Sequence, residues 1–231
     1  MEQAPRKVAV FDIDGTIFRS SLLLELVERL IQKGLFPETT RAAYEREERE
    51  WLDRKGDYEA YINRVVQVFA EQLKGVSYDE VNYLSGEIVE EKKDRVYRYT
   101  RDLIKELKGR GYYLLAISHS PKLVVDGFAY EMGFDKAYGT IYEVGPNECF
   151  TGTVEDKDLI NNKAAVLQRA MRKEGLTFEG SVAVGDTESD IPMLEMAERP
   201  IAFNPNAKLY KHAKVRQWDV VVERKDVIYP L

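Results

Sequence analysis

The sequence has 231 residues, 44% of them hydrophobic, which is enough to build a packed core in one or two domains. Its 34 basic and 40 acidic residues give a net charge of -6, which disfavours nucleic acid as a partner. The single cysteine, Cys149, excludes an intrachain disulfide, and no apolar run suits a signal peptide or a membrane span, so we expect a cytoplasmic protein without a membrane partner.

The first part of the chain reads as one strand followed by helices. The apolar run 8–11 predicts a buried strand that ends in Asp12-Ile13-Asp14-Gly15-Thr16. Helical spacing predicts helices over 20–33, 38–55, 58–74 and from 78 onward; Ser77 and Glu80 have capping-box spacing at the last of these. Because no strand pattern interrupts this stretch, we expect an inserted all-helical cap domain over residues 19–93, with hinges near 18–19 and 92–94.

The rest of the chain alternates strands and helices. Strands are predicted over 112–117, 181–184, 200–203 and 219–222, and a β-hairpin over 139–153. Helices are predicted over 95–108, from Pro121, over 163–173 and 191–197, and near 208. The predicted fold class is therefore α/β: a Rossmann-like parallel sheet core, residues 1–18 and 94–231, with helices on both faces.

Polar side chains follow three of the predicted strands. Asp12 and Asp14 follow the first, Ser118 follows the strand over 112–117, and Asp186 with Asp190 follows the strand over 181–184. Ligands of open α/β sheets bind at the carboxyl ends of the strands, so we expect these side chains to form one site. The alternatives are that Asp190 only caps the helix at 191 and that Ser118 is an ordinary turn residue.

Four carboxylates at one edge of a sheet predict a bound cation. Two like charges about 4 Å apart cost on the order of 4 kcal/mol at an effective dielectric constant near 20. Oxygen ligands, with neither cysteine nor paired histidines nearby, favour a hard ion. Mg2+ is the expected cofactor because it joins a few carboxylates to a substrate phosphate.

These motifs resemble those of the haloacid dehalogenase-like superfamily. Asp12-x-Asp14-Gly15-Thr16 is similar to motif I, Ser118 to motif II, Lys163 to motif III, and Gly185-Asp186 with Asp190 to motif IV. The resemblance follows the chain in order and includes a helical cap between motifs I and II. The residues around Ser118, together with Gly139-Thr140 and Phe150-Thr151-Gly152, are similar to the phosphoserine-phosphatase-like branch, which hydrolyses small phosphomonoesters.

The resemblance implies a role for each residue of the site. Asp12 is expected to attack phosphorus, and Asp14 to protonate the departing alkoxide and then deprotonate water. Mg2+ is expected to bind the Asp12 and Asp186 side chains and the Asp14 carbonyl, with Asp190 bound directly or through water. The expected phosphate contacts are Gly15, Thr16, Ser118, His119 and Lys163. Lys157 and Lys173 are alternatives to Lys163. The alternative for His119 is a role in packing. Ser120 as N-cap and Pro121 at the first helical position are expected to aim a helix N-terminus at the phosphate.

The predicted function is a Mg2+-dependent phosphatase that hydrolyses a small phosphorylated metabolite through an aspartyl-phosphate. The alternatives are a phosphoserine phosphatase proper and a phosphotransferase or phosphomutase on the same fold. A dehalogenase is disfavoured by Asp14, and a non-catalytic binding module is disfavoured because all four motifs are present. The oligomeric state is left open.

Departures from the branch predict that phosphoserine is a poor substrate. Gly15 stands where those enzymes usually carry Ser, and Ser21 stands where a Glu helps to hold the ammonium group. Ser189 replaces an Asn that is common near motif IV. Glu25 and Arg64 are the remaining candidates for holding the two charged groups of an amino acid.

Overall fold

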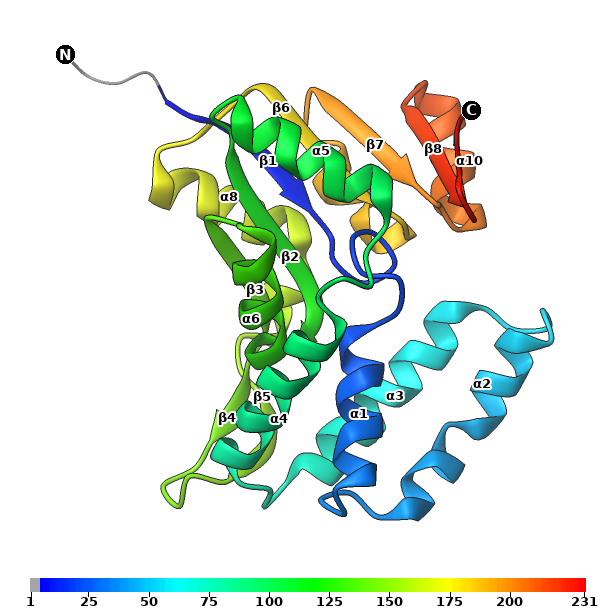
Figure 1. Cartoon of the computed structure of the whole chain (residues 1–231), viewed down its shortest axis with the longest axis vertical. Coiled ribbons are helices and arrows are strands. Elements are labelled where there is room, and N and C mark those ends of the chain that lie inside the picture. The colour runs from blue at the N-terminus through cyan, green and yellow to red at the C-terminus, as the bar shows by residue number, and fades with distance from the viewer. Residues whose placement is uncertain (1–4) are drawn as a thin grey trace.

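The computed structural model describes residues 5–231, and its centre is a seven-stranded sheet (Figure 1). The strand order is β3-β2-β1-β6-β7-β8-β9. The strands are β1 (Lys7–Phe11), β2 (Tyr113–Pro121), β3 (Lys136–Thr140), β6 (Thr177–Gly185), β7 (Arg199–Phe203), β8 (Asp219–Arg224) and β9 (Val227–Pro230). Neighbouring strands pair in parallel except β8 and β9, which are antiparallel. The predicted α/β class with a parallel sheet is confirmed.

Helices cover both faces of this sheet because successive side chains of each strand point to opposite faces. Ala9 and Phe11 of β1 belong to a core shared with α5 and α6, whereas Val8 and Val10 belong to a second core shared with α8, α9 and α10. The helices are α5 (Arg98–Gly109), α6 (Lys122–Met132), α8 (Lys163–Glu174), α9 (Ile191–Leu194) and α10 (Ala207–Arg216). In the part of the chain that the structure describes, no helix is both long enough and apolar enough to cross a bilayer.

The helices between β1 and α5 gather at one end of the sheet (Figure 1). They are α1 (Leu22–Gln32), the 3-10 helix η1 (Glu38–Ala43), α2 (Glu45–Leu52), α3 (Tyr58–Leu73) and α4 (Tyr78–Lys92). The single helix predicted over 38–55 is wrong, because Tyr44 separates η1 from α2 and its ring turns into the core. We keep the name helical cap for residues 19–93.

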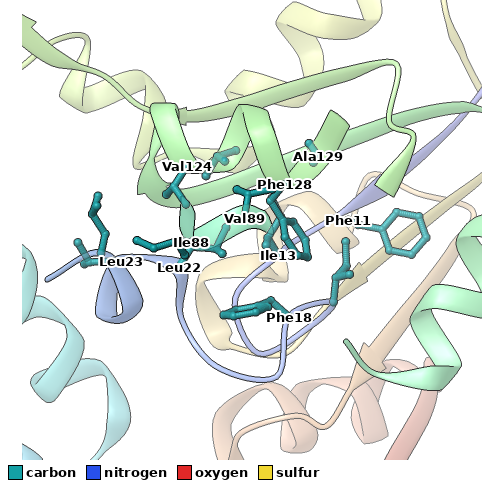
Figure 2. Close-up of a cluster of buried hydrophobic side chains, with 14 of the residues drawn as sticks. Phe11, Ile13, Phe18, Leu22, Leu23, Ile88, Val89, Val124, Phe128 and Ala129 are labelled. Carbon is teal, nitrogen blue, oxygen red and sulfur yellow. The ribbon is translucent and has the colours of Figure 1, made fainter. Parts of the chain in front are cut away.

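The helical cap packs on the core through α1 and α4 (Figure 2). Phe18 and Phe128 meet edge to face with ring centroids 5.5 Å apart. A Cβ atom on Gly127 of α6 would lie 3.2 Å from the Val89 side chain, so the glycine lets α4 approach α6 closely. This packing holds α1, which begins just after the acidic motif, against the end of the sheet.

Backbone hydrogen bonds attach the helical cap to the core in two places. At its two ends, the N–H of Arg19 donates to the carbonyl of Arg95 (3.0 Å), and that of Tyr97 donates to Ile17 (2.9 Å). The link between α3 and α4 also pairs with the predicted β-hairpin, whose strands are β4 (Tyr142–Val144) and β5 (Phe150–Val154). There the N–H of Gly75 donates to the carbonyl of Phe150 (2.8 Å).

Candidate active site

Three carboxylates meet where β1 and β6 end side by side. Asp12 follows β1, Asp186 follows β6, and Asp190 closes the short 3-10 turn η2 (Glu188–Asp190). Each offers one oxygen, and these oxygens lie within 4.8 Å of one another. Asp190 is fully buried and Asp12 is 5% exposed, so the negative charge sits away from bulk water.

Lys163 lies between two of these acids. Its Nζ donates to Asp12 Oδ1 at 2.5 Å and to Asp190 Oδ1 at 2.6 Å, and its side chain is buried. The residue opens α8, whose N-terminus is capped by the Asn162 side chain accepting the N–H of Ala165. The alternative Lys157 is exposed on α7 (Lys157–Ile160), so the buried cation of the site is Lys163.

The charges at this sheet edge shift one another's titration. Burial raises the pKa of Asp12 to about 7; Lys163 lowers it, and Asp190 and Asp14 raise it. Burial, Asp12 and Asp190 likewise raise the pKa of Asp186. Burial lowers the pKa of Lys163, but Asp12 and Asp190 outweigh it and hold the ammonium charged. Negative charge therefore exceeds what one lysine balances.

The donor set at this edge fits a hard divalent cation. Asp12 uses Oδ1 for Lys163, and Asp186 uses Oδ1 to accept the Thr16 hydroxyl at 3.1 Å, so each keeps a second oxygen. Asp190 has both oxygens engaged, because its Oδ2 accepts the N–H groups of Asp186 and Thr187 at 3.0 Å. Asp190 thus holds the turn and Lys163; it makes no side-chain cap bond to α9, so the capping alternative is wrong for that helix.

Asp14 is held by three donors. Its Oδ1 accepts the N–H of Leu22 at 2.5 Å, and its Oδ2 accepts the hydroxyls of Ser118 at 2.6 Å and Ser120 at 2.8 Å. Ser118 is fully buried, whereas Ser120 lines the cavity in front of the acids. The predicted N-cap role of Ser120 is wrong: β2 runs to Pro121, which is itself the residue before α6, and no side chain caps that helix.

Gly15 and Thr16 support Asp186 from the motif I loop. Gly15 has a φ of +78°, and a Cβ atom there would collide with the Asp186 carboxylate, so a side chain is excluded twice. The buried Thr16 hydroxyl donates to Asp186 Oδ1. Both residues are predicted to contact phosphate, and in this structure they lie against the Asp186 carboxylate.

His119 lies beside the acids as a neutral side chain. Burial and the positive charge of Lys163 lower its pKa to about 4. Its Nε2 is buried and has no hydrogen-bond partner among residues 5–231, and the residue lines the cavity. His119 therefore brings an unused polar nitrogen, and no positive charge at neutral pH, to the wall of the site.

A cavity of about 500 Å³ opens in front of the acids and is walled by both the core and the helical cap. Ser21, Leu23, Tyr58, Ile62 and Val66 are cap residues that line it; the first helical turn of α3 supplies Tyr58. Burial and the facing charges of Asp14, Asp186 and Asp12 raise the pKa of Tyr58, so its hydroxyl stays protonated. Tyr61, three residues further along the same helix, is buried in the core, so the sequence alone does not separate the roles of these two tyrosines.

Neither candidate for an amino-acid clamp reaches this cavity. Glu25 pairs with Arg95 at 2.9 Å and Lys92 at 3.8 Å, at the place where the cap joins the core. Arg64 donates to the carbonyl of Ala43 at 2.9 Å. Both side chains are engaged elsewhere, and neither is among the lining residues.

Curated relatives match along nearly the whole chain. The Inhibition of morphological differentiation protein of Streptomyces azureus is 28% identical and covers 94% of this chain and 78% of its own length. A phosphoserine phosphatase of Methanocaldococcus jannaschii is 26% identical over 96% of this chain and 94% of its own. A histidinol-phosphatase of Neisseria meningitidis serogroup C is 24% identical over 94% of this chain and 98% of its own length.

A solved structure and a family description agree with these relatives. A phospho-aspartyl intermediate analogue of phosphoserine phosphatase superposes with a TM-score of 0.63 at 25% identity, covering 96% of each chain. The description of haloacid dehalogenase-like hydrolases matches residues 9–195, which include every acid of the site. The chain therefore belongs to the haloacid dehalogenase-like hydrolase family.

Proposed function

We propose that this protein is a Mg2+-dependent phosphatase that hydrolyses small phosphomonoesters through an aspartyl-phosphate on Asp12. The observation that carries the proposal is the buried cluster in which Lys163 joins Asp12 to Asp190 beside Asp186. Relatives named as phosphoserine and histidinol phosphatases support it, because both names describe the cleavage of phosphomonoesters.

Asp12 and Asp14 have separate parts in the reaction. One carboxylate oxygen of Asp12 attacks phosphorus and forms the acyl-phosphate bond, and the other would stay with the metal; the bond from phosphorus to the leaving alkoxide breaks, and Asp14 gives the alkoxide oxygen a proton. In the second half, water attacks phosphorus while the bond between phosphorus and the Asp12 oxygen breaks; Asp14 takes a proton from that water, the Asp12 carboxylate is regenerated, and inorganic phosphate leaves. The donors from Leu22, Ser118 and Ser120 fix the orientation of Asp14 for both transfers.

The remaining residues hold charge in place. Asp12, Asp186 and the Asp14 carbonyl are proposed as ligands of Mg2+, which when bound neutralises charge on the phosphoryl oxygens. Lys163 presents its ammonium to the same oxygens once Asp12 carries the phosphoryl group. Asp190 positions Lys163.

The test is hydrolysis of p-nitrophenyl phosphate with Mg2+, with EDTA, and with EDTA followed by excess Mg2+. We expect release of nitrophenol only when Mg2+ is available. Full turnover in EDTA would contradict the metal requirement. Product analysis with a hexose monophosphate, in which free phosphate appears and no isomeric sugar phosphate forms, separates the phosphatase from a phosphomutase.

A further inference from the structure

The part of the cavity that lies away from Asp12, Asp14 and Asp186 has two apolar walls. On α3, Tyr58, Ile62 and Val66 recur every four residues and so form one stripe along the helix that lines the cavity. Leu23 at the start of α1 also lines the cavity. Tyr142 and Val154 of the hairpin, with Ile160 of α7, form the opposite surface, which we call the hairpin wall. The β5 strand packs against α3, so these surfaces belong to one joined structure.

The packing keeps the two walls together. The rings of Phe69 on α3 and Tyr142 on β4 meet edge to face at 5.1 Å. A Cβ atom on Gly152 of β5 would lie 3.1 Å from the carbonyl oxygen of Ala70, so the strand lies directly on the helix. The apolar walls are therefore a built feature of the cavity.

Among the residues that the structure describes, the same space offers a carboxylate no free buried cation as a partner, although neutral donors such as Asn63 and Asn161 also line it. Within residues 5–231, no arginine lines the cavity, and its two lining lysines are Lys163, which the acids hold, and Lys157, which is exposed. A pair with a solvated lysine changes an affinity by no more than about fivefold. Beyond the phosphate site the lining acids are Glu59 and Glu188, which Lys208 joins from outside at 3.5 Å and 2.5 Å.

We infer that the natural substrate is the phosphomonoester of a largely apolar alcohol or phenol that carries no carboxylate, an inference that rests on the proposed phosphatase activity. The leaving group lies between the α3 stripe and the hairpin wall, where apolar surface is removed from water. A carboxylate in that space loses its hydration and gains no buried cation in return.

Matched substrates test the inference. Phenyl phosphate and 4-carboxyphenyl phosphate share one ring and differ by a carboxylate, and we expect kcat/KM for phenyl phosphate to be at least about tenfold higher. Across ethyl, propyl and butyl phosphate we expect kcat/KM to rise by up to roughly fourfold per methylene. Equal kcat/KM for the aryl pair, or L-phosphoserine ahead of phenyl phosphate, would overturn the inference.

A charge placed on the α3 stripe gives a second test. Ile62→Lys should raise the ratio of kcat/KM for 4-carboxyphenyl phosphate to kcat/KM for phenyl phosphate by about tenfold or more, because the substitution puts a cation on the cavity wall. Gln67→Lys adds the same charge to the exposed side of the same helix and should leave the ratio within about twofold. An equal change in both variants would show a general field effect and overturn the assignment of the wall. If Ile62→Lys does not fold, as judged by circular dichroism, the wild-type ratios decide.

Binding separates this inference from the proposed function. Phenylphosphonate should bind the Mg2+-loaded protein at least about tenfold more tightly than 4-carboxyphenylphosphonate in isothermal titration calorimetry. If no phosphomonoester is hydrolysed, the proposed function fails, and the phosphonate pair still decides the preference. Equal affinity of the two phosphonates would overturn the inference while leaving a phosphatase intact.

Discussion

Lys163 is the residue on which the charge balance of the site depends. It is the buried cation between Asp12 and Asp190. Lys163→Ala should lower kcat/KM for p-nitrophenyl phosphate by at least about 100-fold, the scale of one lost transition-state charge contact. Lys157→Ala, which removes an exposed lysine from the cavity wall, should cost less than about fivefold. A larger loss in Lys157→Ala than in Lys163→Ala would contradict the assignment.

Asp12 is the proposed nucleophile, and Asn is the substitution that tests this role with the least change in side-chain shape. Asp12→Asn keeps the shape of the side chain but cannot form an acyl-phosphate, so hydrolysis should fall below about one thousandth of wild type. Circular dichroism and the melting temperature report whether the variant is folded. Retention of a tenth of the wild-type kcat would exclude Asp12 as nucleophile.

At the residue scale the sequence indicated which acids lie near one another better than it indicated their hydrogen-bond partners. Strand ends indicated that the acids after β1 and β6 would lie together, and oxygens of Asp12, Asp186 and Asp190 lie within 4.8 Å of one another because the carboxyl ends of adjacent parallel strands share one edge. The sequence could not predict which serine hydroxyl lies behind Asp14 and which lines the cavity. That depends on β2 continuing to Pro121, and on Leu23 donating its N–H to Ser120 from the helical cap.

The N-termini of α3 and α4 differ in whether a side chain caps the helix. Asp57 accepts the N–H of Ala60 at 2.7 Å, whereas Ser77 makes no side-chain cap bond, so the predicted capping box at Ser77 is wrong. Asp57→Ala should cost about 1 kcal/mol of unfolding free energy and Ser77→Ala a few tenths or less. Urea titration of both variants measures the difference, and equal losses would contradict the comparison.

Elements were predicted where the local pattern alone decides them. The helices over 22–32 and 163–174 have regular apolar spacing and clear stops, and both were found within a few residues. The capping box failed because Ser77 is drawn into a bridge with Cys149, a partner far away in sequence. The short strands β3 and β9 were missed as separate strands, since their pairing partners, and not their own composition, place them in the sheet.

The whole molecule should respond to pH and metal together. The raised pKa of Asp12, about 7, means that between about pH 4 and 7 the folded protein binds more protons than the unfolded chain at this group. Its contribution to stability therefore falls as pH rises through that window. In EDTA we expect the melting temperature to fall from pH 5 to pH 7.5, and Asp12→Asn to flatten the slope.

If Mg2+ binds these acids as proposed, it should reverse this loss, because the acids come together only in the folded state. At a concentration of about 100 times its Kd, it adds about 2.7 kcal/mol, or roughly 5–10 °C in melting temperature for a chain of this size. Differential scanning calorimetry at pH 7.5 with EDTA and with excess Mg2+ measures the shift. An unchanged melting temperature in the wild type would contradict Mg2+ binding at the acids.

At this scale the parallel sheet and the family were predicted correctly, because the motifs follow one another in order from Asp12 to Asp190 and strands alternate with helices outside the helical stretch. The division into a core and a helical cap at 18–19 and 92–94 stays a prediction. The hydrogen bonds between the α3–α4 link and the hairpin could not be predicted from the sequence, because they join backbone groups about 75 residues apart and depend on no side-chain pattern.

Those hydrogen bonds limit how a substrate can enter. A cap tied to the core only through residues 17–19 and 95–97 could swing open as one body. Here the α3–α4 link is also tied to Phe150, so swinging would break backbone pairs and separate Phe69 from Tyr142. Opening is then left to the rim of the cavity, where Lys208 pairs with Glu59 of α3 and with Glu188. We expect product release to depend on local motion at this rim, and salt, which weakens such exposed pairs, to speed it.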